Sequence, residues 1–502
     1  MGKRLLKDQL NDEQVEAFKR MSEPGVNVFL TGEAGTGKSF LVNAFVEYEK
    51  GVNGKNILLC APTGTAAQDI NGMTIHRLFG APVEIKKMAQ KDPYAERSDI
   101  FKAADIIIID EISMCRFDLF DFVGKTIDNE NNHRKAASHR RVRNKDERTD
   151  PIKLIVVGDF FQLPPVLKSE DLPVLNELYG NEEFYKQHGF GEGFAFQSAY
   201  WETFGFDYIC LKKVVRQENM EFKKYLRNLR YGINKTETVN WLNSKRSPFA
   251  FEDDDSVFLA YSNAQAKVIN DRKLAEINNT ERFFVAKTKG DVSDGEKFAE
   301  DELTLKVGAK VICTVNDSDK NYCNGTLGIV ESFGNDVIYI GTKNGTVAVK
   351  QYDKSITKYV TRRVPVLDND GNQVMEPELD SNGNQIYKTV KDFDGKEMQV
   401  PMTKPVSKTV IEEEEVGSFT QYPLKLAYAI TVHKSQGKTF EKVNINPYCK
   451  NAGQLYTAIS RCKSAENIFF NFQSTTNPAW VKPEYIITSE AVLKEFKRLW
   501  DE

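Results

Sequence analysis

The segment GEAGTGKS, residues 32–39, restricts the possible folds of this chain more than any other feature. It fits the phosphate-binding pattern GxxxxGK[ST], follows the apolar run VNVFL and opens a helical stretch. Glycines let backbone N–H groups surround phosphate oxygens, and the start of a helix adds positive potential. We therefore predict an α/β fold in which Lys38 reaches the terminal phosphates of a nucleotide and Ser39 binds magnesium. The residues predicted to bind the nucleotide at this turn are Gly32, Gly35, Thr36, Gly37, Lys38, Ser39 and Phe40.

The order of apolar runs predicts two α/β units. Short apolar runs such as NILLCAP, ADIIIID and IKLIVVGD alternate with helical stretches, which is typical of a parallel sheet. The alternation resumes from about Phe206 with DYICL, a polar helix and SVFLAYS. A chain of 502 residues also exceeds the size that one hydrophobic core usually organises. We predict a first unit over residues 1–200 and a second unit over residues 201–305 and 418–502.

A different pattern separates the two parts of the second unit. Between residues 306 and 417, strand-like segments such as AKVICTV and DVIYIG are joined by Gly and Asn turns. This predicts a small antiparallel barrel inserted into that unit. Within it, residues 368–397 repeat Asn-Gly and Asp-Gly turns that favour tight hairpins, so we predict a protruding hairpin arm. A calcium loop is the alternative, but no segment completes the ligand pattern with its terminal glutamate.

A basic run interrupts the first unit between residues 126 and 150. It lacks apolar periodicity, so we predict a solvated loop, with auxiliary binding of DNA or of a partner as the alternative. Its basic residues are Arg134, Lys135, Arg140, Arg141, Arg143, Lys145 and Arg148.

Charge and composition limit the functional classes. The formal net charge of −4 argues against a protein that coats nucleic acid passively, so any DNA contact is expected to be local. No apolar run approaches the roughly 20 residues of a membrane-spanning helix, and the amino terminus lacks a signal core. We predict a cytoplasmic or nucleoid-associated protein without membrane contact. The seven cysteines form no CxxC pair and are expected to be reduced packing residues.

Acidic and amide side chains follow two later strands of the first unit. The run ADIIIIDE ends with Asp110 and Glu111, as expected where the carboxyl end of a buried strand faces a nucleotide. Asp110 suits magnesium binding, and Glu111 suits polarising the attacking water. In VVGDFFQLPP, Gln162 can orient water or sense the γ-phosphate, with an ordinary surface glutamine as the alternative. Together with Lys38 these residues predict hydrolysis of ATP rather than its storage.

Two arginines beyond the first unit are candidates for arginine fingers. They are Arg216 in LKKVVRQEN and Arg461 in QLYTAISRCKS. Each could reach across a cleft and stabilise negative charge on the transferred phosphoryl group. For either arginine alone, a surface ion pair is the default interpretation.

A set of motifs in a fixed order carries a family resemblance. The set resembles the superfamily-one B DNA helicases and, more narrowly, the petite-integration-frequency (PIF) family. The stretch from EISM to LIVVGDFFQLPP is its most specific part, and the long basic insertion departs from the family pattern there. The motifs are LNDEQ (10–14), GEAGTGKS (32–39), APTGTAA (61–67), TIHRLFG (74–80), DEISM (110–114), GDFFQLPPV (158–166), VVRQ (214–217), AYAITVHKSQGKTF (427–440) and LYTAISRCKS (455–464).

The resemblance implies a fold, an activity and partners. The fold would be two RecA-like domains with ATP between them and an inserted Src-homology-type barrel. The activity would be 5′-to-3′ movement on single-stranded DNA with ATP and Mg²⁺, in DNA repair, recombination or telomere maintenance. The segment from Met73 to about Asp99 is helical and polar enough that we also predict a small wedge there, which splits the duplex. The expected partners are single-stranded DNA and duplex or G-quadruplex junctions, and the expected state is a monomer.

The resemblance also implies roles for individual residues. Gln14 would read the adenine, and Gly437 and Lys438 would approach the phosphates. Arg216 and Arg461 would be the fingers that close from the second domain. Hydroxyls, backbone N–H groups and a lone lysine bind phosphates without reading bases, so binding should tolerate any sequence. The residues implied to touch the DNA backbone are Thr63, Gly64, Thr74, His76, Thr431, His433, Lys434 and Ser435.

Two other functions use the same phosphate-binding set. One is that of a RecD-like recombination subunit, which acts within a larger complex. The other is that of a nucleotide-switched DNA-binding protein without processive unwinding. Stimulation of hydrolysis by DNA, and strand separation by the isolated chain, distinguish these alternatives from a helicase.

Overall fold

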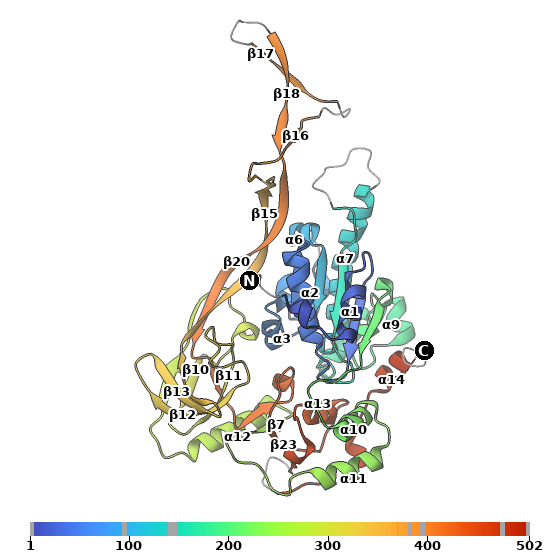
Figure 1. Cartoon of the computed structure of the whole chain (residues 1–502). Coiled ribbons are helices and arrows are strands. Elements are labelled where there is room, and N and C mark those ends of the chain that lie inside the picture. Colours follow the sequence, from blue (N-terminus) through green and yellow to red (C-terminus); the bar gives the residue numbers. More distant parts are fainter. Residues whose placement is uncertain are drawn as a thin grey trace.

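Six parallel strands form the first sheet of a computed structural model, which describes residues 5–92, 98–138, 148–368, 370–379, 384–391, 397–471 and 477–497 (Figure 1). Every neighbouring pair in this sheet is parallel, as predicted. Leu30 is level with Val157 on the neighbouring strand, so the segments that follow these two strands leave the sheet at the same edge. In spatial order the strands are β3 (Met73–Thr74), β2 (Ile57–Ala61), β4 (Ile106–Ile109), β5 (Lys153–Val157), β1 (Val28–Gly32) and β6 (Asp207–Leu211).

Both faces of this sheet are buried, which explains why its strands read as continuous apolar runs. On β4, Ile107 and Ile109 enter one hydrophobic cluster, whereas Ile106 and Ile108 enter another. The helices of this unit are α1 (Asp12–Ser22), α2 (Lys38–Gly51), α3 (Gly64–Asp69), α4 (Ile75–Phe79), α5 (Ile85–Gln90), α6 (Ser98–Ala103), α7 (Phe117–Ser138), α8 (Asp171–Tyr179) and α9 (Glu183–His188).

The predicted solvated loop at 126–150 is wrong in its first half, because α7 continues to Ser138. Arg134 is buried there and donates to Glu130 at 2.9 Å and to the carbonyl oxygens of Phe101 and Ala104 at 2.7 and 2.8 Å. Several of the buried positions on this part of α7 are charged or polar residues. The sequence therefore shows no apolar periodicity there, although the helix has a buried face. Arg148 forms an ion pair with Asp105. Arg140, Arg141, Arg143 and Lys145 lie outside the described residues.

The second α/β unit is built on four parallel strands in the order β22 (Ala429–Thr431), β7 (Ser256–Ala260), β23 (Lys442–Ile445) and β24 (Ile468–Phe470). Two predicted boundaries of this unit need correction. The strand DYICL is β6 and pairs with β1 in the first sheet. Phe496 packs on Phe29 and Phe160 of the first unit, at ring distances of 5.7 and 5.5 Å. The helices after β6 are α10 (Met220–Tyr231), α11 (Lys235–Lys245), α12 (Asn263–Ala275), α13 (Gln454–Ile459) and α14 (Glu490–Lys497).

The β-rich part between β7 and β22 begins earlier than the predicted residue 306. Its first strands are β8 (Arg282–Val285), β9 (Lys287–Gly290) and β10 (Glu302–Leu305), and β10 pairs with β8. An antiparallel sheet follows, with its strands around their own hydrophobic cluster. Its order is β14 (Gly345–Lys350), β13 (Val337–Thr342), β12 (Leu327–Phe333), β11 (Lys310–Cys313) and β21 (Leu424–Leu426).

A long hairpin extends from the β-rich part, and it is longer than the predicted arm at residues 368–397. Its base is formed by β15 (Tyr352–Pro365) and β20 (Ser407–Gln421), which pair along their whole length, and the arm projects away from both α/β units (Figure 1). The base also contacts the first unit, where Tyr359 Oη accepts a hydrogen bond from the backbone N–H of Leu59. The outer pairs are β16 (Met375–Pro377) with β19 (Thr403–Pro405), and β17 (Tyr387–Lys391) with β18 (Glu397–Pro401).

Two further sequence expectations concern membranes and thiols. In the part of the chain that the structure describes, no helix combines the length and the apolar character that crossing a bilayer requires. All seven cysteines have free thiols, and five of them are buried, as packing residues are.

Candidate ATP site and nucleic-acid interface

The turn between β1 and α2 has the shape of a phosphate cradle. Gly35 and Gly37 have φ of +84° and +83°, which L-residues rarely adopt. A Cβ at Gly35 would also lie 2.5 Å from Arg216 Cβ, and one at Gly37 would lie 2.6 Å from Gln14 Nε2 and displace that side chain. Lys38 Nζ donates to the carbonyl oxygens of Gly32 and Glu33 at 2.9 and 3.2 Å. Burial lowers the pKa of Lys38, while the nearby charges of Asp159 and Glu111 raise it.

Asp110 and Glu111 follow β4 at the same edge of the sheet. Burial and the adjacent Glu111 charge raise the pKa of Asp110 to about 7. Burial also raises the pKa of Glu111, and the charges of Lys38 and Arg461 oppose this shift. Glu111 has φ of +50°, a strained conformation for a residue with a side chain, and such strain concentrates at functional sites. The two carboxyl groups, a lysine and an arginine therefore share one buried site.

Gln162 lies where the two α/β units meet. Its Oε1 accepts a hydrogen bond of 3.5 Å from Nε2 of Gln436, which belongs to the second unit. The backbone there is in close contact with Gly453, where a Cβ would lie 2.1 Å from the carbonyl oxygen of Gln162. Gln162 is buried, so the interpretation as a surface glutamine is wrong.

Arg216 belongs to the first unit, which corrects the prediction that it closes from the second. Because β6 pairs in parallel with β1, the residues that follow β6 lie beside the phosphate-binding turn that follows β1. The backbone N–H groups of Val215 and Arg216 donate to the Gly35 carbonyl at 2.8 and 3.3 Å. The guanidinium then reaches the second unit and donates to the carbonyl oxygens of Ser460 and Gly437 at 3.2 and 3.4 Å.

Arg461 enters the same site from the second unit. Its side chain is 2% exposed and donates to the Thr457 carbonyl at 3.0 Å and to Ser460 Oγ at 2.8 Å. Burial and the charge of Arg216 lower the pKa of Arg461, and the charge of Glu111 opposes that shift. Arg461 therefore faces Arg216 and Glu111 across the boundary between the units.

The remaining predicted nucleotide contacts fall into two groups. Gln14 is buried in the capping box of α1, and its Nε2 donates to the Thr36 and Gly37 carbonyls at 3.4 Å each. Ser39 and Phe40 are exposed at the start of α2. Lys438 lines a cavity together with Lys434 on the side of α3, and the carbonyl of the preceding residue, Gly437, accepts a hydrogen bond from the guanidinium of Arg216.

The predicted DNA contacts of the first unit cap two short helices. Oγ1 of Thr63 and Oγ1 of Thr74 accept the backbone N–H groups of Ala66 and Arg77 at 3.3 and 3.2 Å. Gly64 touches the backbone of Gly295, since a Cβ on Gly64 would lie 1.4 Å from the Gly295 carbonyl oxygen.

The predicted contacts of the second unit lie on different surfaces. Thr431 and Lys434 line a cavity of about 340 Å³ between α3, α12 and the β-rich part. His433 lines a separate cavity of about 610 Å³ beside Leu163 and Pro164. Ser435 is fully buried, and its hydroxyl donates to the Val432 carbonyl, so this conformation does not present it to DNA.

Both predicted histidines are partly buried. Burial and the charge of Arg116 lower the pKa of His76, and the charge of Asp118 partly opposes this shift. Burial lowers the pKa of His433. Each imidazole is therefore neutral near pH 7 and can still donate a hydrogen bond.

The sequence patterns missed several residues that the fold brings to these sites. Lys425, on β21, lines the same cavity as Lys434 and Lys438. Arg230 and Tyr456 contact Asp159 immediately after β5. Asp159 stands within the motif GDFFQLPPV and could have been singled out, but no pattern around Lys425 or Arg230 indicates a contact.

Comparison with known proteins gives three findings. A family model described as PIF1-like helicase matches residues 9–179. A protein of Campylobacter jejuni named ATP-dependent DNA helicase Pif1 is 30% identical over 468 residues, which cover 88% of this chain and 88% of that protein. The crystal structure of a Bacteroides Pif1 in complex with ADP-AlF4 is 28% identical, with a TM-score of 0.70 over 98% of this chain and 97% of that chain.

A second structure of Bacteroides Pif1, bound to single-stranded DNA, is 29% identical and matches 98% of this chain and 97% of that chain with a TM-score of 0.59. This chain is thus more similar in shape to the complex with ADP-AlF4 than to the complex with DNA. By its match to the family model, its full-length similarity to the Campylobacter protein and its fold, the chain belongs to the PIF1-like helicase family.

Proposed function

We propose that the chain moves 5′ to 3′ along single-stranded DNA as an ATP-dependent DNA helicase and separates duplex or structured DNA. ATP dependence and helicase activity are those of the family to which the chain belongs. One observation carries the proposal: Lys38 and Glu111 of one α/β unit and Arg461 of the other share a single buried site. The direction of movement rests on the family resemblance alone.

The architecture proposed for this activity is two RecA-like domains with ATP at their boundary. The β-rich part between β7 and β22 would be the Src-homology-type barrel, and residues from about 73 to 99 would supply the wedge. Only part of that segment is free to act as a wedge, because Met73, Ile75, Leu78 and Phe79 are buried in the core of the first unit. We expect the chain to act as a monomer at single-strand junctions with duplex or G-quadruplex DNA.

The residues at the boundary fit a nucleotide with magnesium. Buried oxygens of Gln217 and Gln436 have no hydrogen-bond partner within the described residues, and ligand atoms could satisfy them. The Asp110 carboxylate and the Ser39 hydroxyl are oxygen ligands of the kind that Mg²⁺ prefers. Bound Mg²⁺ would neutralise charge on the phosphates. Lys38 would bind the terminal phosphates, and Gln14 would lie beside the base.

The proposed motor action follows from the positions of these groups. Glu111 holds and polarises the attacking water, and Gln162 orients it from the neighbouring strand end. Arg216 and Arg461 stabilise the charge that develops on the phosphoryl group. These groups come from both units, so hydrolysis of ATP changes the interactions between the two units. The units then move apart or together, and this movement displaces the DNA.

The DNA backbone would pass over the cavity lined by Thr431 and Lys434. We add Lys425 to the predicted contacts, since its amino group makes no hydrogen bond or ion pair within the described residues and lines this cavity. An unpaired lysine in a cavity attracts a phosphate more strongly than one that is already paired. The phosphate contacts would carry no base specificity.

Lys425 makes DNA binding dependent on pH. Burial and the charges of Lys434 and Lys438 lower the pKa of Lys425 to about 8. The amine is therefore charged below pH 8 and neutral above it, so affinity for single-stranded DNA should fall as the pH rises from 7 to 9. Lys425→Gln should weaken binding at pH 7, remove most of this pH dependence and reduce the slope of log K against log salt by about 0.7.

Fluorescence anisotropy with a labelled oligothymidine at several salt concentrations measures these quantities. The matched control is Lys267→Gln, because Lys267 lines the same cavity but is neutralised by an ion pair of 2.7 Å with Asp271. Equal losses in the two variants, or an unchanged pH dependence in Lys425→Gln, would remove Lys425 from the interface.

Two assays on the isolated chain test the proposed function as a whole. Single-stranded DNA should stimulate ATP hydrolysis strongly, and a duplex with a 5′ single-stranded tail should be separated faster than one with a 3′ tail. Stimulation without separation would favour a RecD-like subunit that needs partners. Absence of stimulation would leave a nucleotide-switched binding protein, and faster separation with a 3′ tail would reverse the proposed direction.

A further inference from the structure

A buried ion pair connects α10 to the end of β5, beside the ATP site. Arg230 donates to Asp159 through Nη2 at 2.8 Å and through Nε at 3.2 Å, and both side chains are about 1% exposed. The guanidinium also lies over the ring of Phe161, at 4.4 Å from its centroid. Arg230 therefore holds Asp159 in one orientation. Loss of this partner would leave the Asp159 carboxylate buried and unpaired, which is strongly unfavourable.

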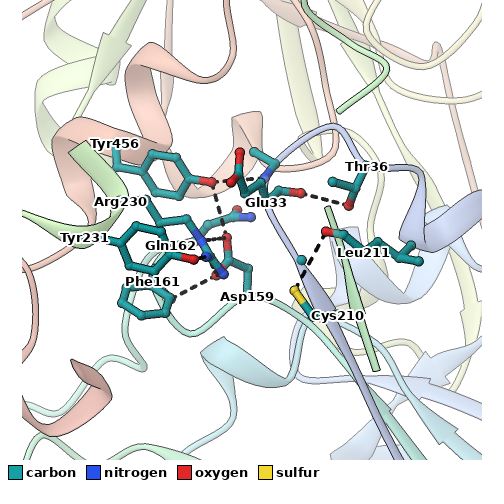
Figure 2. Close-up of polar contacts among 12 residues, drawn as sticks. Glu33, Thr36, Asp159, Phe161, Gln162, Cys210, Leu211, Arg230, Tyr231 and Tyr456 are labelled. Atoms are coloured by element: carbon teal, nitrogen blue, oxygen red, sulfur yellow. Dashed lines mark hydrogen bonds and ion pairs between the residues drawn. The ribbon is translucent and has the colours of Figure 1, made fainter. Parts of the chain in front are cut away.

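Tyr456 joins this pair to the phosphate-binding turn. Its hydroxyl donates to Asp159 Oδ2 at 3.3 Å and accepts the backbone N–H of Ala34 at 3.0 Å. Figure 2 shows the Tyr456 hydroxyl between Asp159 and the turn at Glu33, with Arg230 beside the carboxylate. A single hydroxyl of the second unit thus touches two segments of the first unit, the turn that binds the phosphates and the end of β5.

The helix that carries Tyr456, α13, also accepts a hydrogen bond from the Arg461 side chain. The next residue, Thr457, accepts the Arg461 Nε–H at its carbonyl oxygen, at 3.0 Å. At its other end, α13 is preceded by its N-cap residue Gly453, whose backbone is in close contact with that of Gln162. Arg461 lies two residues beyond the end of α13, so a shift of Tyr456 relative to Asp159 also displaces Arg461.

We propose that Tyr456 is a positioning residue for ATP hydrolysis. By fixing α13 against the phosphate-binding turn and Asp159, its hydroxyl sets the distance from Arg461 to the reacting phosphate. Arg230 supports it by holding the Asp159 carboxylate that accepts the hydroxyl. The inference rests on the proposed role of the site in ATP hydrolysis and deepens it, because no catalytic contact to ATP is required of Tyr456 itself.

Tyr456→Phe removes only the hydroxyl and conserves the volume of the buried ring, so folding should be retained. With saturating single-stranded DNA, kcat should fall by about 10-fold to 100-fold, because small displacements of a catalytic group have effects of this size. The KM for ATP and the affinity for ADP should stay within about twofold. The affinity for ADP with aluminium fluoride, which mimics the transferred phosphoryl group, should fall together with kcat.

The matched control is Tyr261→Phe. Tyr261 is a partly buried tyrosine of the second unit, and its hydroxyl donates to the Asn446 carbonyl at 2.8 Å and makes no hydrogen bond to the first unit within the described residues. It should leave kcat and aluminium fluoride binding unchanged at a similar cost in melting temperature. Gly453→Ala supplies a second, independent displacement of α13, because its Cβ would meet the Gln162 carbonyl oxygen, and it should also lower kcat more than ADP affinity.

The proposal is overturned if Tyr456→Phe keeps the kcat of the unaltered chain, or if ADP and ADP with aluminium fluoride lose affinity equally. Equal losses would mean that the hydroxyl only stabilises the site. Failure of the proposed function gives a different result, since the unaltered chain would then show no DNA-stimulated hydrolysis at all.

Discussion

Lys38→Ala abolishes measurable ATP hydrolysis while leaving the affinity for single-stranded DNA within about twofold of the unaltered chain. Lys38 is the one cation that the phosphate-binding turn places among its own carbonyl oxygens, with contacts of 2.9 and 3.2 Å to Gly32 and Glu33. Alanine supplies no charge for the terminal phosphates, and loss of such a group lowers kcat by about 10² to 10³ or more. A coupled ATPase assay with and without oligothymidine, together with fluorescence anisotropy, measures both quantities.

The matched control for this change is Lys50→Ala. Lys50 lies in the last turn of the same helix, α2, roughly 18 Å from Lys38 along the helix axis. It should retain full DNA-stimulated hydrolysis. Turnover by Lys38→Ala at the rate of the Lys50 variant would show that this turn is not the ATP site.

Arg461→Ala should lower kcat by about 10³ to 10⁵ and leave the affinity for ATP within a few fold. The guanidinium faces Glu111 from the second unit and is held by the carbonyl of Thr457 and the hydroxyl of Ser460. Its orientation is therefore set by the protein's own groups, and its charge is of use mainly when negative charge develops on the phosphoryl group. Pre-steady-state hydrolysis and binding of a fluorescent ATP analogue separate the two effects.

Because Arg461 is almost fully buried, alanine also leaves a cavity and could destabilise the second unit. Arg461→Lys keeps a positive charge and much of the volume, but it lacks the planar fork that makes several directed hydrogen bonds. It should melt close to the unaltered chain and still hydrolyse ATP far more slowly. A lysine variant with unchanged kcat would show that the catalytic arginine is elsewhere, with Arg216 as the first candidate.

The local motifs identified the phosphate-binding turn and the strand end that the structure brings to one edge of the first sheet. The turn at residues 32–39 and the strand that ends at Asp110 have short-range patterns, so glycine spacing and apolar alternation were sufficient to recognise them. The hairpin arm was also recognised, because Asn-Gly and Asp-Gly turns are local signals. The roles given to individual DNA contacts remain predictions, and the buried position of Ser435 counts against one of them.

Predictions about which unit a residue belongs to were less successful. The strand DYICL was assigned to the second unit but lies in the first sheet. Arg216, which follows this strand, therefore also belongs to the first unit. The helical stripe of α7 was hidden because Glu130 and Arg134, although charged, are buried together as an ion pair of 2.9 Å. In both cases a distant segment also takes part, because β6 pairs with β1 and Arg134 donates to the carbonyl oxygens of Phe101 and Ala104, and neither apolar spacing nor charge in the sequence reports these contacts.

The sequence by itself determined what each local segment can do: bend around a phosphate, end a strand in carboxylates, or turn back as a hairpin. These properties depend on backbone conformation and on neighbours a few residues away. Only the tertiary structure decided which segments act together. The contact between the Ala34 N–H and the Tyr456 hydroxyl joins residues 422 positions apart. It forms because the two α/β units pack against each other.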